Sequence, residues 1–178
     1  MKKVLLAAAL TIFATLSAFA QTPKPADPKD VATRDSIVKA VYDVISGDMG
    51  KARDWDRFRS LFHPDARLIP TNKNVETGLF SSKALSPDEY VKRVEPVFAK
   101  QGFFETELAR HTDQYGSIVQ IFSTYESRRT PKDPMPFARG VNSFQLLNDG
   151  KRWWIVTIYW LGETPDFPLP PELLKNRN

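Results

Sequence analysis

Hydrophobic residues recur at helical spacing in the first half of the chain, and this pattern predicts three helices. Apolar side chains appear every three or four positions over residues 30–46, over residues 55–63 and again over residues 86–102. A short strand is expected over residues 66–70. Residues 71–85 show no clear period and are expected to form a loop.

The second half of the chain alternates between apolar and polar residues, as strands do. Four strands are expected, over residues 103–113, 117–129, 137–147 and 151–161. A Tyr-Gly pair at 115–116 and an Asn-Asp-Gly run at 148–150 provide tight turns within each pair of strands. The element order predicts an α+β fold: a cone-shaped α+β barrel in which three N-terminal helices pack on a strongly curved antiparallel sheet.

Strand alternation divides the side chains of the predicted sheet between two faces. With one turn near Asp133 and another at 148–150, the more apolar set is expected to line the concave face, where a few polar groups stand among apolar ones. This set comprises Phe122, Thr124, Glu126, Gly140, Asn142, Phe144, Leu146, Trp154, Val156, Ile158 and Trp160. The other set, which includes Tyr125, Trp153 and Tyr159, is expected to face outward. A slip of one residue would exchange the two sets.

A pocket is expected inside the cone, lined by Tyr42, Thr124, Glu126, Asn142, Phe144 and Trp160. The turn at 115–116 would also place Glu105 opposite Glu126. Two facing carboxyl groups at low dielectric share a proton, which suits acid–base chemistry. In the alternative, Glu105 lies on the rim, or Arg128 or Arg139 pairs with Glu126 as plain structure. Tyr42 either points its hydroxyl into the cone or caps the core.

His111 and Asp113 form a second candidate for acid–base chemistry, because side chains two residues apart on a strand share a face. The alternative is a solvated histidine at the end of a strand. The chain has two histidines and no cysteine, so no metal site is expected. It also carries no glycine-rich phosphate loop and no nucleophile elbow, so no cofactor is expected.

The first twenty residues are typical of a secretory signal peptide. Lys2 and Lys3 precede an apolar run over residues 4–16, and the Ala-Phe-Ala run at 18–20 fits a cleavage site. The apolar run is short for a membrane anchor. We therefore expect cleavage after Ala20, export to the periplasm and no attachment to the membrane afterwards. Beyond the signal peptide at 1–20, the expected organisation is a Pro-rich linker at 21–30, one domain at 31–162 and a Pro-rich extension at 163–178.

Composition narrows the classes of protein that fit. The formal net charge is +4, and two of these charges belong to Lys2 and Lys3, so +2 is left for the exported chain. That balance, without a dense basic patch, argues against a nucleic-acid partner. With no cysteine there is no disulfide, so the domain must rely on its core. A hydrophobic fraction of 42%, with twelve Phe and four Trp, can supply one.

Three stretches give the chain a family likeness. They are residues 54–58 (Asp-Trp-Asp-Arg-Phe), residues 61–66 (Leu-Phe-His-Pro-Asp-Ala) and the closing Asn-Asp-Gly turn before Trp154. Over residues 31–162 the chain resembles the nuclear transport factor 2-like superfamily, in its SnoaL-like bacterial branch. The resemblance implies the cone fold. It leaves activity open, because the superfamily holds ketosteroid isomerases, polyketide cyclases, dehydratases, epoxide hydrolases and non-catalytic binding proteins.

Three functional hypotheses follow from these patterns. In the first, a periplasmic domain of unassigned function binds a small, largely apolar molecule in the cone. In the second, a lyase, isomerase or hydrolase uses Glu126, with Glu105 or His111, as acid and base. In the third, the outer face of the sheet buries against a second copy of the chain. The resemblance implies an Asp or a His–Asp pair in the cone of such enzymes, and no single residue of this sequence clearly fills that role.

Overall fold

The computed structural model of the protein describes residues 24–177. The predicted signal peptide at 1–20 lies outside the described residues. The helices are α1 (Pro28–Val31), α2 (Arg34–Ile45), α3 (Trp55–Ser60), α4 (Pro87–Phe98) and the 3-10 helix η1 (Pro171–Leu174). The strands are β1 (Phe62–Lys73), β2 (Phe80–Ser82), β3 (Phe104–Tyr115), β4 (Ile118–Arg128), β5 (Ala138–Asn148) and β6 (Trp153–Gly162).

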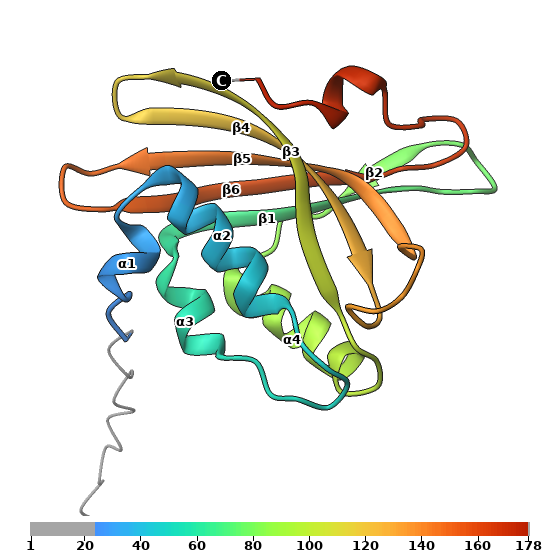
Figure 1. Ribbon diagram of the computed structural model, residues 1–178, viewed down its shortest axis with the longest axis horizontal. Coiled ribbons are helices and arrows are strands. Elements are labelled where there is room, and N and C mark those ends of the chain that lie inside the picture. Colours follow the sequence, from blue (N-terminus) through green and yellow to red (C-terminus); the bar gives the residue numbers. More distant parts are fainter. Residues whose placement is uncertain (1–23, 178) are drawn as a thin grey trace, which may run out of the picture.

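The six strands form one curved, unclosed sheet in the order β2-β1-β6-β5-β4-β3. Helices α1 to α4 lie on the same side of this sheet, within its curve (Figure 1). Strand β1 runs parallel to β6, and the other pairs are antiparallel, so the sheet is mixed. The predicted cone-shaped α+β fold is confirmed. Within residues 24–177, no helix is long and apolar enough to cross a membrane.

The helices begin where the sequence offers caps. Thr33 and Ser86 each accept a hydrogen bond from a backbone amide of the first turn, and each forms a reciprocal capping box, with Ser36 and Glu89 respectively. A short additional helix, α1, begins at Pro28, inside the stretch that the sequence predicted as linker. The side chain of Asp27 caps it by accepting the amide hydrogen of Lys29.

Strand β1 is longer than its sequence pattern predicts. It begins at Phe62, where a helix was expected to continue to His63. Helix α3 stops at Ser60, and Pro64 cannot continue a helix because its ring removes the amide donor. Strand β2, at residues 80–82, lies in the predicted loop. All three of its residues are exposed, so it has no alternation of buried and exposed positions that the sequence could reveal.

The pairing of strand β4 with β5 is shifted by one residue from the expected register. Tyr125 pairs with Gly140 and Ser127 with Ala138, so the odd-numbered residues of β4 face the concave side together with the even-numbered residues of β5. The predicted concave position of Thr124 and Glu126 is therefore wrong. The loop of residues 129–137 between the two strands is too long for its turn residues to set the register.

Strand β6 contains a β-bulge, and the alternation of its side chains between the two faces of the sheet changes there. The register with β5 shifts between Gln145 and Leu146, opposite Val156. Trp153 and Ile155 on one side of this bulge are buried, and so is Ile158 on the other side. Strict alternation could not predict this result, because a β-bulge adds an unpaired residue to one strand. The expectation that Trp153 faces outward is wrong for this reason.

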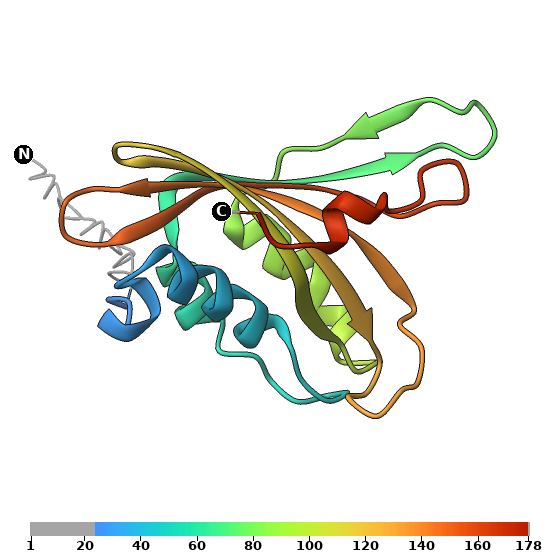
Figure 2. The same cartoon turned by 45° about the horizontal axis from the view of Figure 1, so that its top comes forward.

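The C-terminal segment returns to the outer face of β3 and β4 (Figure 2). The Thr124 hydroxyl donates to the carbonyl of Leu173 at 2.5 Å, and the amide of Arg177 donates to the carbonyl of Arg110 at 2.8 Å. Strand β3 is the last strand in the order of the sheet, so this contact also covers part of an otherwise unpaired edge. Residues after Gly162 thus pack as part of the domain.

Candidate functional site

The concave face of the sheet and helices α2, α3 and α4 enclose a cavity of about 200 Å³. Aromatic rings supply much of its wall: Tyr42, Phe58, Tyr90, Phe103, Tyr125, Phe137, Phe144 and Trp160. The remaining apolar side chains come from α2, β1, β5 and β6. Phe137 is 45% exposed and marks the open end of the cavity. Such a wall suits an apolar ligand.

The structure brings four of the six predicted lining residues to this cavity. Tyr42, Asn142, Phe144 and Trp160 all contribute to its wall. Tyr42 is buried, and its hydroxyl is hydrogen-bonded on the sheet side of α2. Asn142 is also buried, on the concave face of β5.

The other two predicted lining residues lie on the opposite face of the sheet. Thr124 is buried under the C-terminal segment, and Glu126 forms an ion pair with Arg128. The pairing of Glu126 with an arginine is the structural alternative that the sequence left open. Glu105 and Glu126 do not face each other either, because the residue opposite Glu105 is Ser127.

His111 and Asp113 are also remote from the cavity. The Nε2 atom of His111 lies 2.8 and 2.9 Å from the backbone carbonyls of Glu172 and Lys175, in the C-terminal segment. The Asp113 side chain is 80% exposed and lies 3.9 Å from Arg177. These two residues share a face, as predicted, but it is the outer face. They do not form an acid–base pair in the cone.

Glu105 is the carboxyl group that the fold brings to the cavity wall. The Ser127 hydroxyl donates to its Oε2 atom at 2.8 Å, and the Asn142 amide donates to its Oε1 atom at 3.3 Å. Burial raises the pKa of Glu105 to about 7, although both hydrogen bonds act to lower it. Near neutral pH, this group is therefore able to hold or release a proton inside an apolar space.

Two further tyrosines stand near Glu105: Tyr90, which the sequence did not single out, and Tyr125, whose expected outward position is wrong. Tyr90 on α4 and Tyr125 on β4 both line the cavity. Burial raises the pKa of each phenol, and the nearby Glu105 carboxyl raises it further, so both stay protonated. Neither hydroxyl forms a hydrogen bond to another residue of the described chain. Tyr90 was part of a helical stripe that predicts a core residue equally well, so the sequence held no separate signal for it.

Gly140 makes room for the Tyr125 side chain. A Cβ atom at this position would lie 2.7 Å from the Tyr125 hydroxyl oxygen and 2.4 Å from the carbonyl oxygen of Leu161. Both contacts are shorter than real Cβ atoms show, and the second involves backbone that cannot move aside easily. Close packing against the Tyr125 side chain and the β6 backbone is therefore the reason for glycine at this position.

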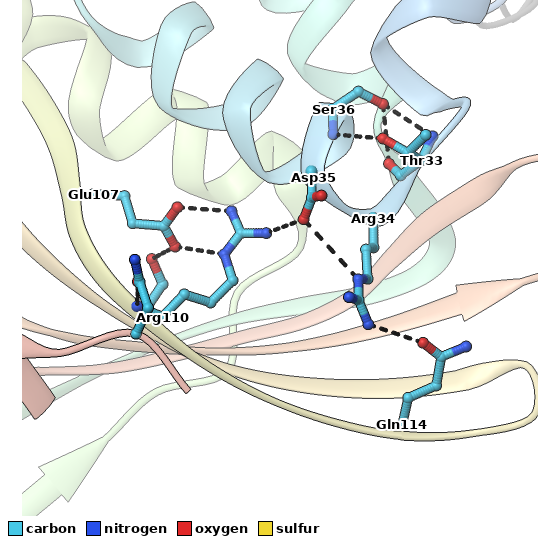
Figure 3. Close-up of polar contacts among 9 residues, drawn as sticks. Thr33, Arg34, Asp35, Ser36, Glu107, Arg110 and Gln114 are labelled. Carbon is cyan, nitrogen blue, oxygen red and sulfur yellow. Dashed lines mark hydrogen bonds and ion pairs between the residues drawn. The ribbon is translucent and has the colours of Figure 1, made fainter. Parts of the chain in front are cut away.

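A second group of polar side chains gathers around Arg110, where Glu107 and Asp35 both point toward the guanidinium (Figure 3). Glu107 accepts hydrogen bonds from Ser123 at 2.6 Å and from two nitrogens of Arg110, at 2.9 and 2.7 Å. Arg110 also contacts Asp35 on α2 at 2.5 Å. Ser123 lies 2.7 Å from the Tyr42 hydroxyl, so this group connects to the cavity wall. In the part of the chain that the structure describes, no group of three His, Cys, Asp or Glu side chains could hold a metal ion.

Comparisons with known proteins establish the fold. No family model matches the chain, and no curated protein matches it significantly in sequence. An NTF2-like protein of unknown function from Silicibacter pomeroyi DSS-3 is similar in structure, with a TM-score of 0.51 and 15% identity over 74% of this chain and 94% of that one. A second NTF2-like protein of unknown function, from Pseudomonas putida KT2440, has a TM-score of 0.56 and 9% identity over 77% and 93% of the two chains.

A third similar structure is described as the β subunit of an aromatic-ring-hydroxylating dioxygenase from Novosphingobium aromaticivorans DSM 12444. Its TM-score is 0.57, with 15% identity over 75% of this chain and 88% of that one. At such identities the likeness concerns the fold. The chain has the nuclear transport factor 2-like fold that its sequence resemblance predicted.

Proposed function

We propose that this protein binds a small, largely apolar molecule in its cavity, with Glu105 as the polar contact. The observation that carries the proposal is a cavity of about 200 Å³ whose apolar wall is interrupted by one carboxyl group with a pKa of about 7. A dry apolar cavity of about 150 Å³ in another protein accommodates benzene. The expected ligand is thus about the size of one substituted ring.

The polar contact limits what the ligand can carry. When protonated, Glu105 can donate a hydrogen bond to a carbonyl or ether oxygen. When ionised, it can accept one from a hydroxyl group. Ser127 and Asn142 already donate to Glu105, so they help to hold it at the wall. A ring with one hydroxyl or carbonyl group fits this arrangement better than a plain hydrocarbon or a charged molecule.

The test is a ligand panel measured by thermal shift and calorimetry: toluene, phenol, cyclohexanol and cyclohexanone. The oxygen-bearing rings should bind more tightly than toluene. Replacing Glu105 with Gln should weaken their binding by about tenfold, which corresponds to about 1.4 kcal/mol, or one hydrogen bond to a charged or strongly polar group. The matched control is Glu126→Gln on the outer face, which should leave binding unchanged. If no member of the panel binds at millimolar concentration, the proposal fails.

A second candidate function is acid–base catalysis by Glu105 on a cyclic substrate. It is favoured by the pKa of about 7, because a general base works best when its pKa lies near the operating pH. We expect a lyase or isomerase that takes a proton from carbon and returns it. The protein in D₂O should then exchange the α-hydrogens of a bound cyclic ketone, as seen by NMR, and Glu105→Gln should abolish the exchange. Exchange at the same rate in both proteins would rule out this function for Glu105.

Export and self-association complete the proposal. The signal pattern of residues 1–20 supports a periplasmic protein.

The outer face of the sheet keeps Phe122 and Tyr159 exposed, at 40% and 46%, which supports a homodimer formed through this face. A single mass of one chain in light scattering at high concentration would count against the dimer.

A further inference from the structure

A row of hydrogen bonds leads from a partly buried ion pair to the cavity. It begins at Glu107, whose carboxylate is held by Arg110 through two parallel hydrogen bonds of 2.9 and 2.7 Å (Figure 3). The side chains of Glu107 and Arg110 are 24% and 14% exposed. A guanidinium group can only donate hydrogen bonds, so both carboxylate oxygens of Glu107 accept from Arg110. Glu107 can therefore only accept hydrogen bonds.

The acceptor role of Glu107 fixes the direction of the next two hydrogen bonds. Ser123 is fully buried and has one hydroxyl proton, which it donates to Glu107 at 2.6 Å. The Tyr42 hydroxyl lies 2.7 Å from the same Ser123 oxygen. Because the Ser123 proton is already used, Tyr42 must donate its own proton to Ser123. The Tyr42 oxygen is then an acceptor toward the cavity side.

The direction of these bonds determines which way the Asn142 amide is turned. The Asn142 group lies 3.0 Å from the Tyr42 oxygen. Because that oxygen must receive a hydrogen bond, the atom of Asn142 facing it has to be the amide nitrogen and not the carbonyl oxygen. The same nitrogen lies 3.3 Å from Oε1 of Glu105. Both amide hydrogens of Asn142 are thereby assigned, one to Tyr42 and one to Glu105.

We propose that Glu107 is a positioning residue for the cavity: through Ser123 and Tyr42 it turns the amide nitrogen of Asn142 toward Glu105. This inference rests on the proposed function only in taking the cavity as the binding site. Glu107 is not one of the residues that line the cavity, whereas Glu105, two positions before it on β3, is. It acts on Glu105, the proposed ligand contact, through a row of four hydrogen bonds.

The groups around Glu107 and Glu105 determine how the pKa of Glu105 should respond to a change at Glu107. Glu107 faces Arg110 from its own strand, Ser123 from β4 and Tyr42 from α2, with Asp35 of α2 behind Arg110.

Glu105 faces Ser127, Asn142, Tyr90 and Tyr125, and none of these carries a charge near pH 7. The donation from Asn142 holds the pKa of Glu105 lower than burial alone would. Turning the Asn142 carbonyl toward Glu105 would remove this donor and favour the protonated acid.

The test is the titration of Glu105, followed by NMR of its side-chain carboxyl carbon in Glu107→Gln. A glutamine amide can donate to Ser123, which lets the row of hydrogen bonds reverse and Asn142 turn over. The Glu105 pKa should then rise by about one pH unit, the effect of one hydrogen bond. Loss of the negative charge of Glu107 would by itself lower the Glu105 pKa, because the positive charge of Arg110 is left behind. The sign of the change therefore separates the two explanations.

A second variant makes the test independent of charge. Ser123→Ala keeps Glu107 and Arg110 but interrupts the row, so Tyr42 is free to donate to Asn142, and the Glu105 pKa should rise here as well. Asp35→Asn changes a charge at Arg110 without touching the row, and it should leave the Glu105 pKa unchanged. An unchanged or lowered pKa in Ser123→Ala overturns the proposal, even if Glu107→Gln does not fold. No ligand is needed, so a failure of the ligand panel would leave this result standing.

Discussion

Replacing Glu105 with Gln should stabilise the protein above pH 7 and remove a pH dependence of stability that we expect for the original protein between about pH 4.5 and 7. The pKa of Glu105 is raised by burial from 4.5 to about 7 in the folded protein. In the unfolded chain the group returns to its ordinary value. Between these two values the folded state binds more protons than the unfolded state, so the free energy of unfolding falls as pH rises.

The size of this effect follows from the same two values. Each unit of pKa difference corresponds to about 1.4 kcal/mol, and solvent at the open end of the cavity reduces the full figure, so we expect a loss of about 2–3 kcal/mol. The stabilising contribution is fully present below about pH 4.5 and is lost as pH passes 7. Glutamine has nearly the shape of Glu105 and carries no charge to desolvate.

Urea denaturation of both proteins at pH 5, 6, 7 and 8 measures this difference. The curves should separate as pH rises, with Glu105→Gln the more stable protein at pH 8. Glu126→Gln is the matched control, because Glu126 is paired with Arg128 on the outer face, so this variant should keep the pH dependence of the original protein. Equal pH slopes in the original protein and Glu105→Gln would show that Glu105 is not desolvated.

Glu105 lowers the free energy of unfolding at neutral pH, so we expect it to serve a function. An apolar or amide side chain at position 105 would give a more stable core, since a buried carboxyl group must either hold a proton or lose its solvation. Proteins retain such groups chiefly at functional sites. The stability that Glu105 costs at neutral pH therefore supports its proposed role as the polar contact for a ligand.

The sequence predicts those parts of the fold that local signals determine. Capping residues such as Ser86 and Glu89 lie three positions apart and act within one turn, so α4 begins where expected. The Asn-Asp-Gly turn likewise sets the last hairpin. The pairing of β1 with β6 joins segments about ninety residues apart, which no short-range pattern encodes. Its parallel direction became visible only in the folded chain.

The candidate site was harder to predict for a related reason. Asn142 and Trp160 pair with each other beyond the bulge of β6, and both reach the cavity, as predicted. Glu126 was assigned through the long loop before β5, and one residue of error moved it to the outer face. The contact between Ser123 and Tyr42 joins a strand to a helix 81 positions away, so only tertiary structure could reveal it.

The largest loss of stability is expected from Arg53→Met, at about 3–5 kcal/mol. Arg53 follows α2 and is only 8% exposed. Its guanidinium donates to the carbonyls of Ile45 at 2.9 Å, Gly47 at 2.6 Å, Asp48 at 3.2 Å and Lys51 at 2.5 Å. Backbone carbonyls at a helix end need partners when they are buried. Each hydrogen bond to a charged group contributes about 1.5–3 kcal/mol, and four bonds on one side chain do not add fully.

The Arg53→Met change should also loosen the cavity wall, because the loop that Arg53 holds is hydrogen-bonded to a lining residue. Gly47 and Phe103 exchange two hydrogen bonds, of 2.7 and 3.0 Å, and Phe103 lines the cavity. A Cβ atom at Gly47 would lie 2.7 Å from the Arg53 guanidinium, so the loop is packed tightly around this side chain. Without Arg53, the amides of Gly47 and Phe103 should exchange hydrogen with solvent faster, while amides in the centre of β5 keep their protection.

Two comparisons make the Arg53 result specific. Arg53→Lys should be intermediate, because a compact ammonium group cannot reach all four carbonyls that the planar guanidinium spans. Arg59→Met removes a more exposed arginine that pairs with Asp56 and Asp88, and surface ion pairs contribute about 1 kcal/mol or less. If Arg53→Met is no less stable in urea than Arg59→Met, the loop holds its shape without the guanidinium. In that case Phe103 owes its position at the cavity to its stacking on Phe98 and not to Arg53.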